Sequence, residues 1–447
     1  MEAVELADVQ GLILRGYTMP VARYFGLAVR EATAARALLT SLVDSDPAVP
    51  SITTARPWPV KPEYCVNLGI TYRGLTALGV PSASLASFPV EYREGAVARA
   101  VNVGDVGTSA PDHWLRWLVD PGLHLLLMLS AQSGAALDAA TKQLEQAWST
   151  SCVELGRHDG ASLSGDAAHF GYRDGLSQPT IDGVPPAGLP DHLPRAPVGE
   201  FLLGYPSQFD QFSYPVPDPP ELGINGSFAA FRVLEQDVDA FAKFVTRQAS
   251  ATGLPEELIE AKLCGRWRNG MPLVLSPDTD TPEPPIPLEA MNDFDYIGEY
   301  ADEQGYRCPV GSHIRRMNPR GQRVAGGCGH LHRIVRRGIA YGPPYDPAHP
   351  RDGQARGLLG LFIGVSLHDQ FEFLMTQWAN DGIFTAGLGR TNDPLIGAQA
   401  NGTGSFSIPQ AERSVVLQGL TRFVTTRGGA YCFLPSVPAI RYLAALA

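Results

Sequence analysis

The chain has 447 residues, of which 44% are hydrophobic and 18% charged, so it is long enough for two or three domains and can bury a large core. This composition excludes a disordered chain and a small scaffold held together by disulfides. The 46 acidic residues exceed the 35 basic ones and leave a formal charge of −11, which argues against a general nucleic-acid or anionic-membrane binder.

No segment predicts a membrane span or a secretory signal. The longest uncharged apolar run, residues 358–367, has ten residues, whereas a helix that crosses a bilayer needs about 18 to 20. Glu2, Glu5 and Asp8 stand where a signal peptide would carry basic residues before an apolar stretch. Six cysteines without a C-x-x-C pair indicate reduced, mostly buried thiols. We therefore expect a cytoplasmic protein without a disulfide framework.

The first half of the chain alternates strand and helix patterns. Residues 10–17 form a short apolar run that ends in a turn signal, which predicts a strand, and helical spacing follows over 38–43. The pattern returns as a strand at 123–129, a helix with one apolar face at 137–148, and a strand at 152–155.

The second half repeats this theme. A strand at 228–234 precedes a helix at 238–245, and a strand at 358–365 precedes a helix whose apolar residues recur at i, i+3, i+4 and i+7 over 371–378. The segments between strands are too irregular for repeated parallel crossovers. We therefore expect an α+β fold with antiparallel sheets and helices on one face.

Two connectors rich in proline interrupt these patterns, at 185–220 and 282–287. Loops of such length are either mobile or functional. We place the domain boundary near the first connector, which gives an N-terminal domain over 1–205 and a C-terminal domain over 206–447.

The first candidate for a functional site is the loop around Asp174. Gly171 and Gly175 bracket this carboxylate, so the backbone can turn sharply and approach a flat partner closely. An ordinary Asp-Gly turn, capped by its own side chain, explains the same pattern.

The second segment places His313 beside Arg315, Arg316 and Arg320. A neutral imidazole can ligate a metal through one nitrogen while a carboxylate holds its other N–H, and guanidiniums can clamp anionic groups. A haem needs both, because its iron takes an axial ligand and its propionates are negatively charged. A solvated basic turn with a structural histidine is the alternative.

The third segment is 332–344, where alternating apolar residues predict a strand. In such a strand Arg336 and Arg337 point to opposite faces, so one of them points inward. A buried arginine requires an anion or a polarisable ligand to offset its desolvation. Two surface arginines on a partly exposed strand remain the alternative.

Taken together, these segments carry motifs in a conventional order: Gly-x-x-Asp-Gly at 171–175, Ser-His-Ile-Arg-Arg-x-Asn-Pro-Arg at 312–320, and Arg-Arg-Gly-Ile-x-Tyr-Gly at 336–342. Lesser pieces occur at 10–17, 265–270 and 431–438. The chain resembles the dye-decolourising peroxidases, a family of haem enzymes, over nearly its entire length, and the long connectors are similar to insertions in the larger members.

This resemblance implies two ferredoxin-like domains with antiparallel sheets and surrounding helices, of the dimeric α+β barrel type. It also implies one haem b (iron protoporphyrin IX) per chain, with His313 as the axial ligand of the iron. Arg315 and Arg320 are expected to bind the cofactor. Asp174 and Arg336 are expected to be catalytic on the distal side, the first as proton shuttle and the second as the charge that stabilises the breaking O–O bond.

Three further residues are assigned to the site. Asp393, in a Thr-Asn-Asp-Pro segment, is the expected acceptor of the His313 N–H, although an Asp-Pro turn explains it equally well. Leu361 and Phe362 resemble the apolar lining of the family's distal wall, with ordinary core packing as the alternative.

The implied function is a haem peroxidase that reduces hydrogen peroxide through a ferryl intermediate and oxidises phenols, dyes or a specialised metabolite in one-electron steps. Its partners would be peroxide and a small aromatic reductant, without nucleic acid or membrane, and a homo-oligomer stays open. One alternative is a haem-binding or delivery protein without turnover. Another is a zinc module built on Cys308, Cys328, His330 and His332, whose spacing matches no usual zinc pattern.

Overall fold

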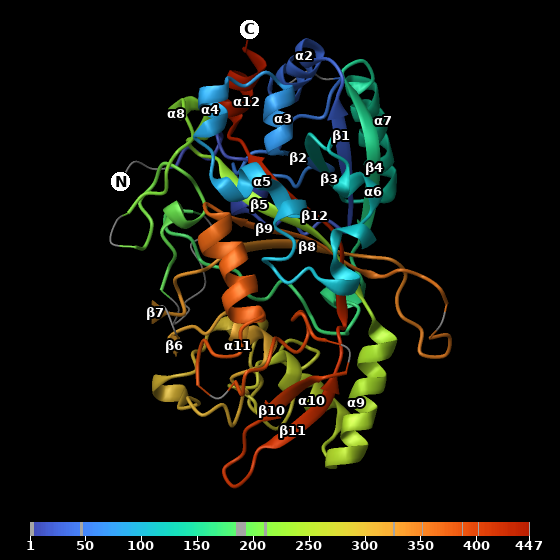
Figure 1. The fold of residues 1–447 in the computed structure, drawn as a ribbon, viewed down its shortest axis with the longest axis vertical. Helices are drawn as coiled ribbons and strands as arrows, with labels where there is room; N and C mark the ends of the chain where they lie inside the picture. Colours follow the sequence, from blue (N-terminus) through green and yellow to red (C-terminus); the bar gives the residue numbers. More distant parts are fainter. Residues whose placement is uncertain are drawn as a thin grey trace.

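The computed structural model describes residues 4–44, 48–184, 194–209, 212–324, 327–350, 352–386, 388–400 and 402–446. Its centre is one eight-stranded antiparallel sheet in the order β4-β1-β3-β2-β12-β5-β9-β8 (Figure 1). These strands are β1 (Val21–Val29), β2 (Tyr64–Ile70), β3 (Leu125–Ala131), β4 (Cys152–Ala161), β5 (Ser227–Gln236), β8 (Val335–Tyr341), β9 (Gly357–Gly364) and β12 (Val424–Leu434). The hairpins are β6 (Arg323–Val324) with β7 (Gly327–Cys328), and β10 (Gly404–Ile408) with β11 (Val415–Leu420).

The sheet consists of two halves with the same topology. In the first, helix α2 (Ala32–Val43) connects β1 to β2 and α7 (Gly134–Trp148) connects β3 to β4, and the strand order is β4-β1-β3-β2. In the second, α9 (Val238–Thr252) follows β5, and the π-helical turns η7 (Leu367–Glu372) and η8 (Leu374–Ala379) follow β9. Each half is thus a β-α-β-β-α-β unit, so the prediction of ferredoxin-like architecture is confirmed.

The halves meet at the centre of the sheet and approach each other again at its edges. Strands β2 and β12 pair at Ile70 and Phe433. At the edges, the rings of His158 on β4 and Tyr341 on β8 lie 4.5 Å apart, yet the described residues form no β4–β8 ladder. The sheet is therefore not closed into a hydrogen-bonded barrel, and a seam remains between β4 and β8.

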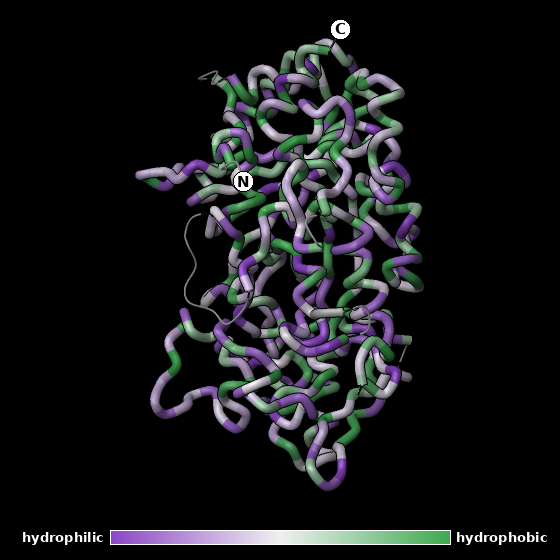
Figure 2. The backbone as a smooth tube through the Cα atoms, turned by 90° about the vertical axis from the view of Figure 1, so that its left-hand side faces the viewer, coloured by the Kyte–Doolittle hydropathy of each residue, from purple (hydrophilic) through white to green (hydrophobic). Residues whose placement is uncertain are grey.

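Shorter helices cover the ends of both halves. They are α1 (Gly11–Leu14), α3 (Tyr72–Ala77), α4 (Ser82–Ala86), α5 (Val90–Ala98), α6 (Arg116–Val119), α8 (Pro220–Gly223), α10 (Glu256–Cys264), α11 (His313–Met317) and α12 (Val437–Ala444). Short 3-10 turns are η1 (Gly107–Ser109), η2 (Pro111–His113), η3 (Ser164–Asp166), η4 (Val198–Glu200), η5 (Leu288–Asn292) and η6 (Gly298–Tyr300). None of the helices in the described ranges is long and apolar enough to span a membrane, and hydrophilic residues recur all along the chain (Figure 2).

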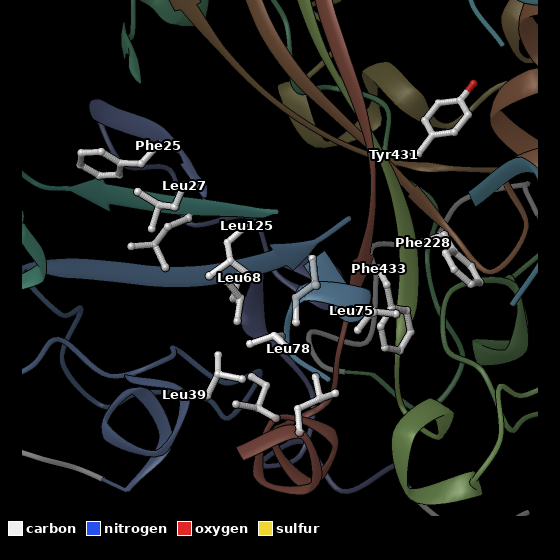
Figure 3. Packing of buried hydrophobic residues seen from close by; sticks show 14 of the residues in the cluster. Phe25, Leu27, Leu39, Leu68, Leu75, Leu78, Leu125, Phe228, Tyr431 and Phe433 are labelled. Atoms are coloured by element: carbon white, nitrogen blue, oxygen red, sulfur yellow. The ribbon is translucent and has the colours of Figure 1, made fainter. Parts of the chain in front are cut away.

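The main core lies between the sheet and the helices of the first half. Leu68 and Leu125 project from neighbouring strands toward Leu39 of α2, and Phe228 packs beside Phe433 in the second half, where β12 borders β2 of the first half (Figure 3). All five side chains are almost completely buried. Burial of one such side chain stabilises the fold by about 1.5–3 kcal/mol, so this core joins both halves into one packed body.

Two local predictions differ from the structure. The strand prediction for 10–17 is wrong, because Gly11–Leu14 form helix α1 while the Gln10 side chain bonds to the backbone of Leu68 at 2.8 Å in both directions. A short apolar run cannot distinguish a strand from a buried helical turn. The helix predicted over 371–378 is present, but it is wound as π turns, which occur often at functional sites.

The strands of the first half lie before residue 205 and those of the second after 206, as the expected boundary requires, although the boundary itself stays a prediction. Part of the first connector, 185–193, lies outside the described residues.

Candidate active site

A cavity lies between the second half of the sheet, helix α11 and the π-helical turns. Its empty space amounts to about 1610 Å³, its open mouth included. We name it the His313 cavity because that imidazole is part of its wall. The wall is mostly apolar, with side chains from β5, β9 and the π-helical turns: Leu234, Leu358, Phe362, Phe371, Leu374 and Met375.

His313 is the first residue of α11, and a buried carboxylate fixes its ring. Its Nδ1 lies 2.9 Å from Oδ2 of Asp393, whose side chain is completely buried. The other carboxylate oxygen accepts the backbone N–H groups of Leu395 and Ile396, each at 2.9 Å. Burial alone would raise the pKa of Asp393, but His313, Arg316 and the Ile396 N–H outweigh it and hold the pKa below its ordinary value. The ionised carboxylate therefore accepts a hydrogen bond from Nδ1, and in the neutral tautomer that keeps this bond the lone pair lies on Nε2.

Arg316 ties α11 to the segment that supplies Asp393. This buried guanidinium donates to the carbonyl oxygens of Trp378 at 2.8 Å and Thr391 at 2.6 Å. The backbone N–H of Asp393 donates to the carbonyl of Ala379 at 2.7 Å. His313 and Asp393 are 80 residues apart in sequence. The buried Arg316 side chain and the π-helical turns thus hold them next to each other.

The structure does not bring Arg315 and Arg320 to the cavity. Both are almost fully buried. Arg315 donates to Asp302 Oδ2 at 3.0 Å and to the carbonyl of Cys308 at 2.6 Å. Arg320 donates to Asn292 and lies with its guanidinium carbon 3.6 Å from the ring centroid of Phe294. In these positions Arg315 and Arg320 connect the loops that precede α11, so their role is structural.

We therefore expect Arg315→Met to lower the free energy of unfolding by about 3–5 kcal/mol, because it leaves Asp302 as a buried unpaired charge. Urea denaturation followed by far-UV circular dichroism measures this. Arg441→Met, at an exposed ion pair with Asp44, is the matched control and should change stability by less than about 0.5 kcal/mol. If the Arg315→Met protein were stable but no longer bound the cofactor, Arg315 would be assigned to cofactor binding after all.

Arg336 lies on β8 at the border of two cavities. It lines the His313 cavity and also a second cavity that contains Asp174, which we name the Asp174 cavity. The Gln178 side chain holds the Arg336 backbone, accepting from its N–H at 3.2 Å and donating to its carbonyl at 2.9 Å. The guanidinium itself donates to the carbonyl of Ser177 at 3.0 Å. The loop after Asp174 is thus docked on β8 beside Arg336.

Asp174 is exposed at the tip of this loop, where its Oδ1 accepts the N–H of Gly175 at 2.7 Å. Its Oδ2 lies 4.0 Å from the place where a Cβ on Gly338 would stand. Asp174 lines its own cavity and not the His313 cavity, but Arg336 and Phe362 line both. The carboxylate therefore faces the same strand as Arg336 across a glycine.

Phe362 and Leu361 occupy opposite faces of β9. Phe362, paired with Arg336, lines both cavities, whereas Leu361, paired with Arg337, packs in a hydrophobic cluster on the other face and lines only the Asp174 cavity. The structure thus brings Phe362, and not Leu361, to His313.

Three charged residues of the His313 cavity, Asp105, Arg232 and Arg422, were not found by sequence reasoning. Among its described lining residues Asp105 is the only carboxylate, and it is bound by Arg232 through two contacts of 2.6 Å. Arg422 donates to the hydroxyl of Ser109 at 2.6 Å, and burial lowers its pKa. Neither Arg336 nor Arg422 forms an ion pair with a described residue, so the cavity offers positive charge to an anionic ligand. No local motif marks Arg422, which lies two residues before the start of β12.

A zinc module receives no support from this region. Among the described residues no group of three or more His, Cys, Asp or Glu side chains could hold a metal ion. Cys308 is buried, and the side chain of Cys328 is not among those that the structure describes.

Comparisons with known proteins agree on one family. Peroxidase 2 of Mycetinis scorodonius is 30% identical over 98% of this chain and 87% of its own length. The dye-decolorizing peroxidase msp1 of the same organism is 30% identical, with the same shares covered. This chain belongs to the dye-decolourising peroxidase family. A solved dye-decolorizing peroxidase in complex with 2,6-dimethoxyphenol matches it with a TM-score of 0.83 and 27% identity over 99% of this chain and 100% of that one. No family model matches the chain.

As a dye-decolourising peroxidase, the chain is a haem enzyme that oxidises organic donors. The His313 cavity fits that cofactor on three grounds. It offers an imidazole Nε2 that makes no hydrogen bond to any described residue, apolar walls for a macrocycle, and guanidiniums without carboxylate partners for its negative groups.

Proposed function

We propose that His313 is the axial ligand of one haem b per chain. The observation that carries this is the His313–Asp393 pair, whose open nitrogen faces an apolar cavity shared with Arg336. A carboxylate partner on the second ring nitrogen orients a ligating imidazole and raises its basicity. Arg422 is suited to hold a haem carboxylate at the same wall, in place of the two arginines named from the sequence.

We further propose hydrogen peroxide as the oxidant, with Asp174 and Arg336 acting on it. When bound, the haem supplies the iron at which peroxide is reduced. The Asp174 carboxylate takes the proton from the inner peroxide oxygen and delivers it to the departing one, directly or through one water. The fixed charge of Arg336 stabilises the negative charge that develops on the departing oxygen. The hydrogen bonds between Gln178 and the backbone of Arg336 hold the loop that carries Asp174 against β8, beside Arg336.

The reductants we propose are small phenols and related aromatic molecules, which lose one electron at a time. The similar structure with bound 2,6-dimethoxyphenol supports this class. The test is the haem-loaded protein itself: we expect a Soret band and turnover of 2,6-dimethoxyphenol only when peroxide is present. A protein that binds haem fully but shows no turnover across acidic to neutral pH would instead be a haem carrier.

For Asp174→Asn, we expect the second-order rate with peroxide to fall about 10²–10⁴-fold, because the amide cannot take up the proton. Stopped-flow absorbance across pH measures this rate. Asp166→Asn is the matched control, since this exposed carboxylate lies in the same cavity and pairs only loosely with Arg173 at 3.8 Å. An unaltered pH–rate profile in Asp174→Asn would remove this residue from proton transfer.

A further inference from the structure

The Asp174 cavity reaches from the catalytic loop to the opposite face of β8. It is lined by Asp174 and Leu358 on one face of the sheet and by Arg337 and Leu359 on the other. Residues of both faces line this one cavity, which passes the edge strand β8 where β4 and β8 form no described ladder, although Gly160 of β4 packs against Ile339 of β8. Gly338 and its register partner Gly360 also place no side chains there. The cavity is therefore continuous from Asp174 to Arg337.

The Arg337 side chain lies at the end of this cavity and has no counterion among the residues that the structure describes. Its guanidinium donates to three carbonyl oxygens, those of Leu12 at 2.8 Å, Ile13 at 3.3 Å and Arg336 at 3.3 Å. An arginine has five N–H donors, so two of them make no hydrogen bond to a described residue. No described carboxylate forms an ion pair with Arg337, and burial lowers its pKa to about 10.

Tyr17 is an ionisable residue close to Arg337, but it does not neutralise the guanidinium. The Tyr17 hydroxyl donates to Oδ1 of Asn67 at 2.9 Å, and burial raises the pKa of this tyrosine far above its ordinary value. Tyr17 therefore remains a neutral phenol. A desolvated guanidinium that is held only by carbonyl oxygens favours the binding of an anion. The anion supplies the missing negative charge and accepts hydrogen bonds from the two remaining N–H groups.

We propose that Arg337 binds the carboxylate of an aromatic acid that serves as a reducing substrate. The proposal rests on the peroxidase function above and adds the substrate class. The cavity is lined by the buried side chains of Met19, Tyr24 and Leu361, the register partner of Arg337, together with polar residues such as Thr18 and Ser130, so it offers a ring an apolar surface that a hydrated inorganic anion does not use. The ring of such an acid lies toward Gly338 and Asp174, next to the haem cavity through Arg336 and Phe362.

The geometry also allows a purely structural task, in which Arg337 only fastens α1 to β8 through the Leu12 and Ile13 carbonyls. That task predicts no difference between charged and neutral substrates. The experiment therefore compares two donors that differ only in charge, 4-hydroxy-3-methoxybenzoate and its methyl ester, in the haem-loaded enzyme with saturating peroxide.

For Arg337→Met we expect KM for the acid to rise about tenfold or more, with kcat within twofold of the parent and KM for the ester unchanged. Arg337→Lys should recover part of the affinity for the acid. Arg441→Met, on α12 and outside the lining of both cavities, should leave both donors unaffected. Comparing each variant with the parent, donor by donor, cancels the different intrinsic reactivities of acid and ester.

Equal changes for acid and ester, or none, would overturn the proposal and leave Arg337 as a structural residue. A parent enzyme that oxidises neither donor would count against the peroxidase function instead. Should Arg337→Met not fold, calorimetry on the parent without peroxide decides: we expect benzoate to bind and benzamide not to bind, with benzoate competing against the acid donor only. Equal binding of both, or competition against the ester as well, contradicts the assignment.

Discussion

Replacement of His313 by alanine is expected to abolish haem retention. Among the described residues that line the His313 cavity, only this imidazole combines an open ring nitrogen with a buried carboxylate on the other nitrogen. Removing it leaves Asp393, buried and charged, without its partner, while the apolar walls remain intact. We expect the purified variant to lack the Soret band after reconstitution with haem, and added imidazole to restore part of it by filling the space left at residue 313.

The matched control is His332→Ala. His332 lines the same cavity, but its Nδ1 lies 2.6 Å from a backbone carbonyl, that of Asp369, and its ring stacks on Phe373 at 3.6 Å. A carbonyl holds the ring in place without the charge that raises the basicity of a ligating nitrogen. We expect the control to keep the parental spectrum. The reverse result, with haem lost from His332→Ala and retained by His313→Ala, would assign the ligand to His332.

The fold was predictable because strand and helix periodicities recur in the same order in each half. The strand at 228–234 and the helix at 137–148, for example, appear as β5 and α7 with nearly the expected bounds. The error at 10–17 has a physical cause, since four consecutive buried residues satisfy a helical turn as well as a strand. The π winding after β9 follows from tertiary packing and has no signature in the spacing of apolar residues.

Local sequence patterns predicted less of the site than of the fold. Arg315 and Arg320 stand beside His313 in sequence, but the short helix α11 turns them away from the cavity toward Asp302 and Asn292. Arg422, more than a hundred residues away from His313, reaches the wall only because β12 crosses the centre of the sheet. The proximity of Asp393 to His313 likewise follows from chain folding, so only the family pattern suggested it.

The second large effect is expected for Arg336→Leu, which should keep haem but react with peroxide about 10²–10³-fold more slowly. Loss of one donor that stabilises developing negative charge typically has this cost in rate. The variant should fold, because Gln178 holds the backbone of residue 336 and these two hydrogen bonds do not involve its side chain. Stopped-flow absorbance at the Soret band, with peroxide in excess, gives the second-order rate constant.

Two further variants separate charge from shape at this position. Arg336→Lys keeps the positive charge but not the planar fork, so its rate should lie between those of the parent and Arg336→Leu. Arg173→Leu removes a guanidinium from the Asp174 cavity that pairs with Asp166, and it should react like the parent. If Arg336→Leu reacts at the parental rate while Asp174→Asn is slow, the carboxylate alone carries peroxide cleavage. Arg336 would then serve, through its bond to Ser177, only to fix the Asp174 loop on β8.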